Sequence, residues 1–427
     1  MNLKDTERVA VVLIIALASS IGAAEVQDGN APQTLQEYLR EAARNNAGLK
    51  AAFEEWKAAL EAVPQAKALP DPRFTYGYFI EEVETRVGPQ KHRLGIMQVF
   101  PWFGTIEART DAASAAAQAA HKRYEASKLQ LFYDVKDAFH EYFYLQSAIE
   151  IARENLDLVR HFEEVARARY TAATAGHPDV IRAQVELATL EDKLIALQEL
   201  REPIVARLNA ALNRPTSEPL PWPKPETHEM MQVDQPTVLA ALRKQNPQLR
   251  AMDFDVEVAR NRIELAKKKF YPDLGVGVDW IVTDDAMISG VRDSGKDPVI
   301  LMFSLNLPIW RKSYGAAELQ ARAQSRRTIH QKQDVENGLL ARTERVLYDY
   351  EDSGRKLRLY EQVLVPKAQE LVGASETAYA AGTVDFLSLI DAERTLLRFR
   401  LECERARANR RQRLAELEML VGVELSD

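Results

Sequence analysis

The sequence predicts a mainly α-helical fold with a small β part, built from two tandem repeats. Two stretches of alternating apolar and polar residues each end in an aromatic, proline-containing segment: residues 99–104 (VFPWFG) and 307–310 (LPIW). Each segment is followed by about sixty residues of uninterrupted helical pattern. A short strand that stops at a proline and passes into a very long helix is unusual. Its occurrence twice in 427 residues indicates an internal repeat rather than two or three unrelated domains.

Composition and the first residues narrow the class of protein. The net charge is −7 and no segment is strongly basic, which argues against a nucleic-acid partner. Residues 1–24 are typical of a signal peptide, because Lys4 and Arg8 precede an apolar run too short to span a bilayer and small residues follow it. An N-terminal membrane anchor is the alternative. The single cysteine, Cys403, cannot form an internal disulfide and lies in a helical pattern.

The first repeat is expected to cover residues 25–214. A helix at 34–67 begins with a capping box formed by Thr34 and Glu37, is interrupted by Pro64 and stops at residues 70–72. A β-hairpin at 73–100 follows, with strands at 74–80 and 92–100 and a polar loop at 81–91. The last elements of this repeat are a long helix at 105–171, a tight break and a return helix at 179–212.

A linker rich in proline and charge, residues 215–236, leads to a second repeat at 237–427. Its expected elements are a helix, a hairpin at 273–307, a long helix at 314–379 bent at Pro366, and a return helix at 385–421. Asn46 and Asn246 match at an offset of 246 − 46 = 200, and Tyr170 and Tyr379 at 379 − 170 = 209. The longer second hairpin loop accounts for most of the change in offset from 200 to 209.

Four strands are too few to close a barrel in one chain. Their apolar side chains share one face and smaller or polar ones share the other, so one face is expected to contact lipid. Unpaired strand edges are costly in a bilayer, and three chains of four strands would close a twelve-stranded barrel without edges. The lipid-facing candidates are Phe74, Tyr76, Tyr78, Val276, Val278, Leu301 and Phe303.

From Thr34 to Val423 the chain resembles the TolC-type outer-membrane factor family, also called outer membrane efflux proteins. The resemblance is carried by the repeat, by the junction at 98–104 (QVFPWFG), by the turn at 379–382 (YAAG), and by residues 389–393 (LIDAE) with their first-repeat counterpart at 180–184. It implies a homotrimer with a short barrel in the cell outer membrane and a long helical tunnel in the periplasm. It also implies passive conduction of substrates delivered by a periplasmic adaptor and an inner-membrane pump.

The resemblance points to the helical turns as the tunnel tip and adaptor contact: Tyr170, Gly176, Asp179, Tyr379, Gly382, Asp385 and Asp391. Rings of acidic residues in a trimer could select or bind cations, whereas Asp179 and Asp385 could equally be helix N-caps, and the two tyrosines could simply pack between helices. Gly176 follows Tyr170 by six residues but Gly382 follows Tyr379 by three, so the first tip is expected to differ in geometry. The barrel–helix junction is assigned to Pro72, Pro101, Trp102, Gly104, Pro272, Pro308 and Trp310.

No catalytic or phosphate-binding motif is present, so neither an enzyme nor a cofactor is expected. His121, His140 and His161 lack the spacing of metal ligands. Residues 228–231 (HEMM) combine histidine and methionine, which suit copper or silver, although a chance cluster in a linker is the simpler reading. The junction is typical of family members paired with heavy-metal pumps, so metal ions or drugs are the expected cargo. A soluble periplasmic coiled-coil scaffold or adaptor is the competing function, but it gives the hairpins no role.

Overall fold

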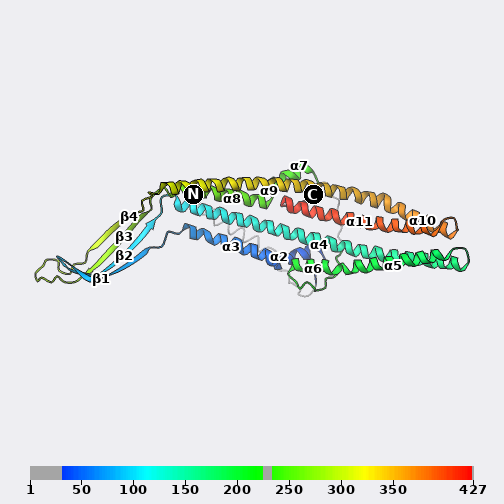
Figure 1. Ribbon diagram of the computed structural model, residues 1–427, viewed down its shortest axis with the longest axis horizontal. Coiled ribbons are helices and arrows are strands. Elements are labelled where there is room, and N and C mark those ends of the chain that lie inside the picture. The colour runs from blue at the N-terminus through cyan, green and yellow to red at the C-terminus, as the bar shows by residue number, and fades with distance from the viewer. Residues whose placement is uncertain (1–30, 225–232, 426–427) are drawn as a thin grey trace, which may run out of the picture.

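The protein forms a long rod in a computed structural model that describes residues 31–224 and 233–425. A small β-sheet lies at one end, a bundle of long helices fills the middle, and two helical turns lie at the far end (Figure 1). The expected signal peptide and the 228–231 cluster fall outside the described residues. Among the residues described, no helix has both the length and the apolar composition needed to cross a bilayer.

The sheet joins the hairpins of the two repeats side by side. Its strand order is β1-β2-β3-β4 with every neighbouring pair antiparallel, so β1 and β4 are the edges. The strands are β1 (Arg73–Thr85), β2 (Gly88–Phe100), β3 (Leu274–Thr283) and β4 (Val299–Leu305).

The predicted polar loop at 81–91 is wrong. Both strands of the first hairpin continue through it, and only residues 86–87 separate them. The polar side chains of these residues favour a loop on sequence grounds. Strands pair through their backbone N–H and C=O groups, however, so polar side chains that face water do not prevent pairing. The register shifts between Tyr78 and Val83, so the extension pairs independently of the inner part of the hairpin. The second hairpin keeps its predicted long loop.

In the first repeat two predicted helices are each broken once. The residues at 34–67 form two helices, because the backbone of Asn46 is extended (ψ 122°) and its side chain caps the second one; Pro64 lies inside that second helix and does not end it. The predicted return helix at 179–212 breaks at Leu200. Pro203 has no N–H for the carbonyl of Glu199, and its ring crowds that carbonyl. The helices are α2 (Leu35–Asn45), α3 (Ala47–Lys67), α4 (Thr105–Thr171), α5 (His177–Glu199) and α6 (Arg201–Leu212).

The second repeat follows the same plan. Pro366 is accommodated by one π-helical turn just before it, in which the Val365 N–H bonds the carbonyl of Tyr360. The predicted long helix is therefore present as three consecutive segments, with the hydrogen-bond pattern changed just before Pro366. Its elements are α7 (Gln235–Gln245), α8 (Pro247–Lys268), α9 (Arg311–Leu359), η1 (Tyr360–Leu364), α10 (Val365–Ala380) and α11 (Phe386–Val421).

Asn46 and Asn246 show how closely the repeats agree. Each caps its helix by accepting the N–H of the residue three positions later, at 2.9 Å. Each also donates its side-chain amide to the end of a helix of its own repeat, Asn46 to the Ala211 carbonyl at 3.0 Å and Asn246 to the Leu420 carbonyl at 2.8 Å. The same residue thus performs the same two tasks in both halves.

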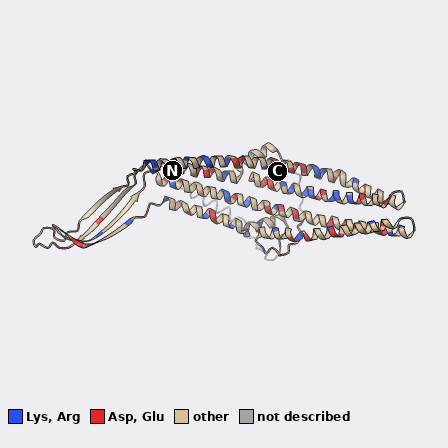
Figure 2. Cartoon of the chain, viewed as in Figure 1, with Lys and Arg blue, Asp and Glu red and all other residues tan. Residues whose placement is uncertain are grey.

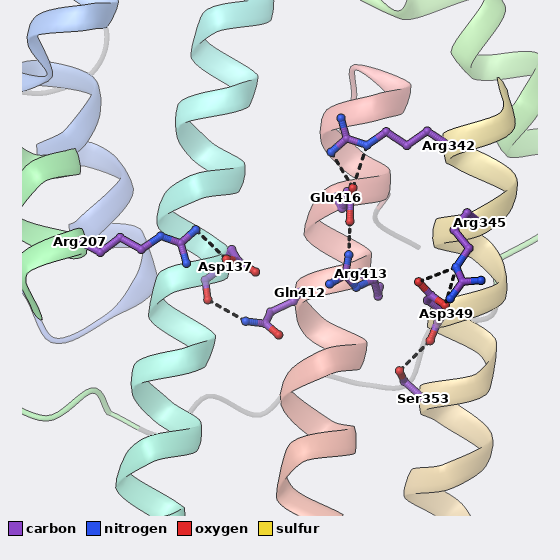
Figure 3. A network of polar contacts seen from close by, with 9 residues as sticks. All are labelled: Asp137, Arg207, Arg342, Arg345, Asp349, Ser353, Gln412, Arg413 and Glu416. Atoms are coloured by element: carbon purple, nitrogen blue, oxygen red, sulfur yellow. Dashed lines mark hydrogen bonds and ion pairs between the residues drawn. The ribbon is translucent and has the colours of Figure 1, made fainter. Parts of the chain in front are cut away.

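The helices pack through an apolar stripe along α4 and through polar contacts both between and within the repeats. The stripe predicted for α4 is buried throughout: Leu131, Val135, Ala138, Tyr142, Leu145 and Ile149. Between α4 and α11, the Gln412 amide donates to the Asp137 carbonyl at 3.1 Å (Figure 3). Between α9 and α11, Arg342 bonds the nearly buried Glu416 at 2.7 Å, and Arg413 bonds the same carboxylate. Since Arg413 and Glu416 both lie in α11, the contact that connects α9 with α11 is the Arg342–Glu416 pair.

Candidate functional site

One face of the sheet is mainly apolar, with His92 and Gln98 as its polar residues on β2. The register aligns Phe74, Ile96, Val278 and Leu301 in a row across all four strands. Six of the seven predicted lipid-facing side chains are exposed, while Val276 is half-buried beside its neighbours. An apolar patch that extends across four strands is unfavourable in water, whereas strands that alternate apolar and polar residues suit the wall of a barrel in lipid.

The opposite face carries small and charged residues. Arg93 forms an ion pair with Asp279, which is 1% exposed. A Cβ atom on Gly95 would overlap the Asp279 carboxylate, and one on Gly275 would overlap the Ser304 hydroxyl. The glycines therefore let polar side chains lie flat against the sheet, which leaves space above this face.

The two strand-to-helix junctions are tied to each other. The backbone N–H of Trp102 donates to the Asp273 carboxylate at 3.1 Å, and the Trp102 ring stacks on Tyr271 at 5.1 Å. The Asp273 N–H in turn donates to the Asn306 side chain. These contacts link the residues that follow β2, precede β3 and follow β4.

Each predicted junction residue lies where a strand meets a helix or a loop. Gly104 is the N-cap of α4 and has a positive φ of 76°, which explains the glycine. Trp310 is the N-cap of α9 and is 72% exposed. The prolines border the strand ends: Pro72, Pro101, Pro272 and Pro308.

The two helical turns at the far end have the same construction, contrary to the expectation from glycine spacing. Ala173 and Gly382 both have positive φ, 59° and 76°. They match at the offset 382 − 173 = 209, the offset of Tyr170 and Tyr379. The following threonines bond back alike, Thr174 N–H to Arg169 and Thr383 N–H to Ala378, both at 2.9 Å. Alanine takes the glycine position in the first turn, so spacing to Gly176 misled the prediction.

Gly176 and Asp385 occupy the N-cap positions of α5 and α11, again at offset 209. The Asp385 carboxylate accepts from the Ser388 N–H at 2.9 Å and hydroxyl at 2.6 Å, and these bonds lower its pKa. The N-cap interpretation is thus right for Asp385. It is wrong for Asp179, which lies in the first turn of α5 behind Pro178 and corresponds to Ser388.

Asp179 instead takes part in a contact between the two tips. The Tyr379 hydroxyl donates to the Asp179 carboxylate at 3.3 Å. The Arg169 guanidinium lies 4.5 Å from the centre of the Tyr379 ring, donates to the Tyr379 carbonyl and reaches the Thr174 carbonyl at 3.1 Å. Burial and the Asp179 charge raise the pKa of Tyr379, so its hydroxyl stays a donor. This tip link, Arg169–Tyr379–Asp179, joins α4, α5 and α10.

Arg169 was missed by the sequence reasoning because an arginine in the last turn of a helix is ordinary. The remaining predicted tip residues do not join the link. Tyr170 is 47% exposed and contacts only the His177 ring among the described aromatic side chains, so it does not pack between helices as Tyr379 does. Asp391 is exposed on α11.

A buried acid lies in the helical bundle on the sheet side of the tip link. Glu393 of α11 is fully buried, and neither carboxyl oxygen is hydrogen-bonded within the described residues. Burial raises its pKa to about 7; the charge of Glu186 adds to the shift, while the amide of Asn155 opposes it. The described residues hold no group of three or more His, Cys, Asp or Glu side chains that could bind a metal.

The chain belongs to the outer membrane efflux protein family, which matches residues 38–214 and 238–423. The two matched segments coincide with the two repeats. Members of this family are efflux channels of the outer membrane, and that function accounts for the hairpins that a soluble scaffold would leave unexplained. The family and the similar solved structures are channels rather than enzymes.

Individual relatives are distant but similar along nearly their whole length. The cobalt-zinc-cadmium resistance protein CzcC of Cupriavidus metallidurans is 21% identical over 87% of this chain and 85% of its own. Nodulation protein T of Rhizobium leguminosarum bv. trifolii is 22% identical over 85% and 79%. The open-state MtrE outer-membrane channel of Neisseria gonorrhoeae has a TM-score of 0.74 at 19% identity, covering 93% of this chain and 90% of its own.

Proposed function

We propose that three copies of this chain form the outer-membrane exit duct of a tripartite efflux system. The observation that carries the proposal is the sheet, which has one mainly apolar face and two unpaired edges, β1 and β4. Pairing β4 of one copy with β1 of the next would satisfy both edges and close a barrel of 3 × 4 = 12 strands. The face with Asp279 and the glycines would line the lumen.

The rod gives this duct its direction. With the sheet in the outer membrane, the helices extend into the periplasm and the tips face the inner membrane (Figure 1). The polar extension of the first hairpin and the long loop of the second would lie outside the cell. The helices of three copies would enclose the tunnel.

The tips are the proposed contact with a periplasmic adaptor and the proposed gate. The tip link holds the two helical hairpins of one copy together through a buried tyrosine. An adaptor that separates the hairpins would have to break the Tyr379–Asp179 bond and expose the ring. The exposed residues around the link, including Tyr170 and Asp391, are the candidates for adaptor contact.

The pump supplies energy, and the duct supplies a path. CzcC is named for resistance to cobalt, zinc and cadmium, which supports metal ions as cargo, whereas nodulation protein T is not named for a metal. Metal ions are therefore the first cargo to test and drugs the second. A wide lumen without a described metal site would leave selection to the pump.

Leu301→Arg tests the lipid-facing assignment. A cation in the middle of the apolar face should cost roughly 2–4 kcal/mol and sharply reduce the amount of protein in outer membranes. Thr75→Arg is the matched control, because Thr75 is exposed on the opposite face of β1. Normal membrane levels of the Leu301 variant, or equal loss of both, would contradict the proposed orientation of the sheet.

A further inference from the structure

The apolar surface of the sheet continues past its end onto the junction with the helices. Four large apolar side chains in the two junctions are more than 60% exposed: Phe103, Leu307, Ile309 and Trp310. They follow β2 and β4 and precede α4 and α9. If the sheet lies in lipid, these side chains are at the level where hydrocarbon gives way to headgroups, the depth that tryptophan prefers.

Five cations lie beside these side chains. Lys and Arg are dense where the sheet meets the helices, at the start of α9 (Figure 2). We call the following set the basic collar: Lys267, Lys268 and Lys269 at the end of α8, and Arg311 and Lys312 at the start of α9. Since α8 and α9 pack against each other, both groups lie at the same level of the rod.

Two members of the basic collar have neighbours within the chain. Lys267 pairs with Glu264 at 2.7 Å, and the amine of Lys268 lies beside Gly104. The other three, Lys269, Arg311 and Lys312, are exposed and form no side-chain ion pair or hydrogen bond within the described residues. Three uncompensated positive charges thus gather at one level of a chain whose net charge is −7.

Helix energetics do not explain the collar. Arg311 and Lys312 are the first two residues of α9, where the positive end of the helix dipole disfavours cations. The first turn contains no acidic residue and the N-cap, Trp310, provides no side-chain hydrogen bond. These two charges therefore weaken the folding of the isolated chain, whereas an anionic partner at this surface would neutralise them.

We propose that the basic collar binds the phosphate groups of anionic phospholipids in the periplasm-facing leaflet of the outer membrane. The proposal rests on the proposed function, which places the sheet in that membrane. An anionic phospholipid fits this surface for two reasons, the positive charge of the collar and the continuity of the collar with the apolar face of the sheet. One lipid can place its chains against Leu307 and Trp310 and its phosphate against Arg311. Juxtamembrane cations attract anionic headgroups in this way.

The test compares two variants with the same loss of charge. The collar variant is Lys269→Gln/Arg311→Gln/Lys312→Gln. The control is Lys50→Gln/Arg153→Gln/Arg358→Gln, which removes three exposed cations from the periplasmic helices. Each purified protein is titrated in detergent with phosphatidylglycerol and with phosphatidylethanolamine, and bound lipid is counted by native mass spectrometry.

The collar variant should bind phosphatidylglycerol about tenfold or more weakly than wild type, with the control unchanged. Phosphatidylethanolamine binding should stay the same in all three proteins, and inorganic phosphate should fail to displace the lipid at equal concentration. Equal phosphatidylglycerol binding by collar variant and wild type would overturn the proposal, as would full displacement by inorganic phosphate. The same spectra report the oligomeric state, so a trimeric wild type without lipid preference refutes the collar alone, whereas a monomer refutes the duct.

Discussion

Tyr379 is the central residue of the tip link. It is 2% exposed, its ring packs edge-on against Phe386 at 5.3 Å, and its hydroxyl reaches a carboxylate on another helix. A hydrogen bond to a charged group contributes about 1.5–3 kcal/mol. Removing only the hydroxyl therefore separates the polar contact from the packing.

Tyr379→Phe should make the duct open more readily. The ring still fits, but the Asp179 carboxylate loses its bond to α10 and keeps its pair with Arg182 of α5. Single-channel recordings in planar bilayers should therefore show more time in high-conductance states. Tyr170→Phe is the matched control, because Tyr170 holds the same position in the first repeat without this bond. Equal conductance changes in both variants would show that the tip link does not hold the tips together.

Glu393 makes stability depend on pH with a defined sign. Its pKa is about 7 in the folded chain against 4.5 for an ordinary glutamate. As pH rises from about 4.5 to 7, the unfolded chain ionises first, so this group progressively lowers the free energy of unfolding. Above pH 7 the deficit is constant, at most roughly 3 kcal/mol.

Glu393→Gln should therefore raise the thermal midpoint of the detergent-solubilised protein at pH 8 and leave it nearly unchanged at pH 4.5. The amide is neutral at every pH and nearly isosteric. Asp391→Asn, two residues away and exposed, should change neither value. A variant that gained no stability at pH 8 would mean that the carboxyl is solvated or paired in the assembled protein.

At the scale of elements, the two tip turns share one backbone geometry but differ in the residue at the position of positive φ. Gly382→Ala should destabilise the second tip by about 1 kcal/mol, because φ is 76° and the new Cβ would lie 3.2 Å from the Arg169 guanidinium. Ala173→Gly should stabilise the first tip, because Ala173 has a positive φ, which strains alanine but not glycine. Hydrogen exchange of the tip amides measures both changes. Slower exchange in the Gly382 variant would contradict the common turn geometry.

The elements recognised from the sequence are those with strong local signals. The capping box at Thr34, the apolar stripe of α4 and the strand ends at proline all depend on neighbouring residues, and each was predictable. Pro203 is also a local signal for the break in the return helix, but the long apolar pattern around it outweighed that signal. Polar residues in the first hairpin were assigned to a loop because pattern alone does not reveal backbone pairing.

The tip link could not be predicted in the same way. Arg169 and Tyr379 are 210 positions apart, and their contact requires that the two long hairpins be equal in length to within a turn. The sequence placed both tyrosines at turns but could not show that only the second turns inward. Aligning the repeats at a single offset of 209 would have paired Ala173 with Gly382 and Asp179 with Ser388, and would have corrected the expected geometry of the first tip.

At the scale of the molecule, the unpaired edges of the sheet and its apolar face indicate a shared barrel, and no single copy can close it. The proposed tunnel, the proposed gate and the proposed lipid binding by the basic collar all depend on this assembly. The most direct test is the native mass of protein extracted from outer membranes in detergent. The proposed duct predicts three times the mass of the mature chain. A soluble monomer or dimer that is absent from the membrane fraction would contradict it.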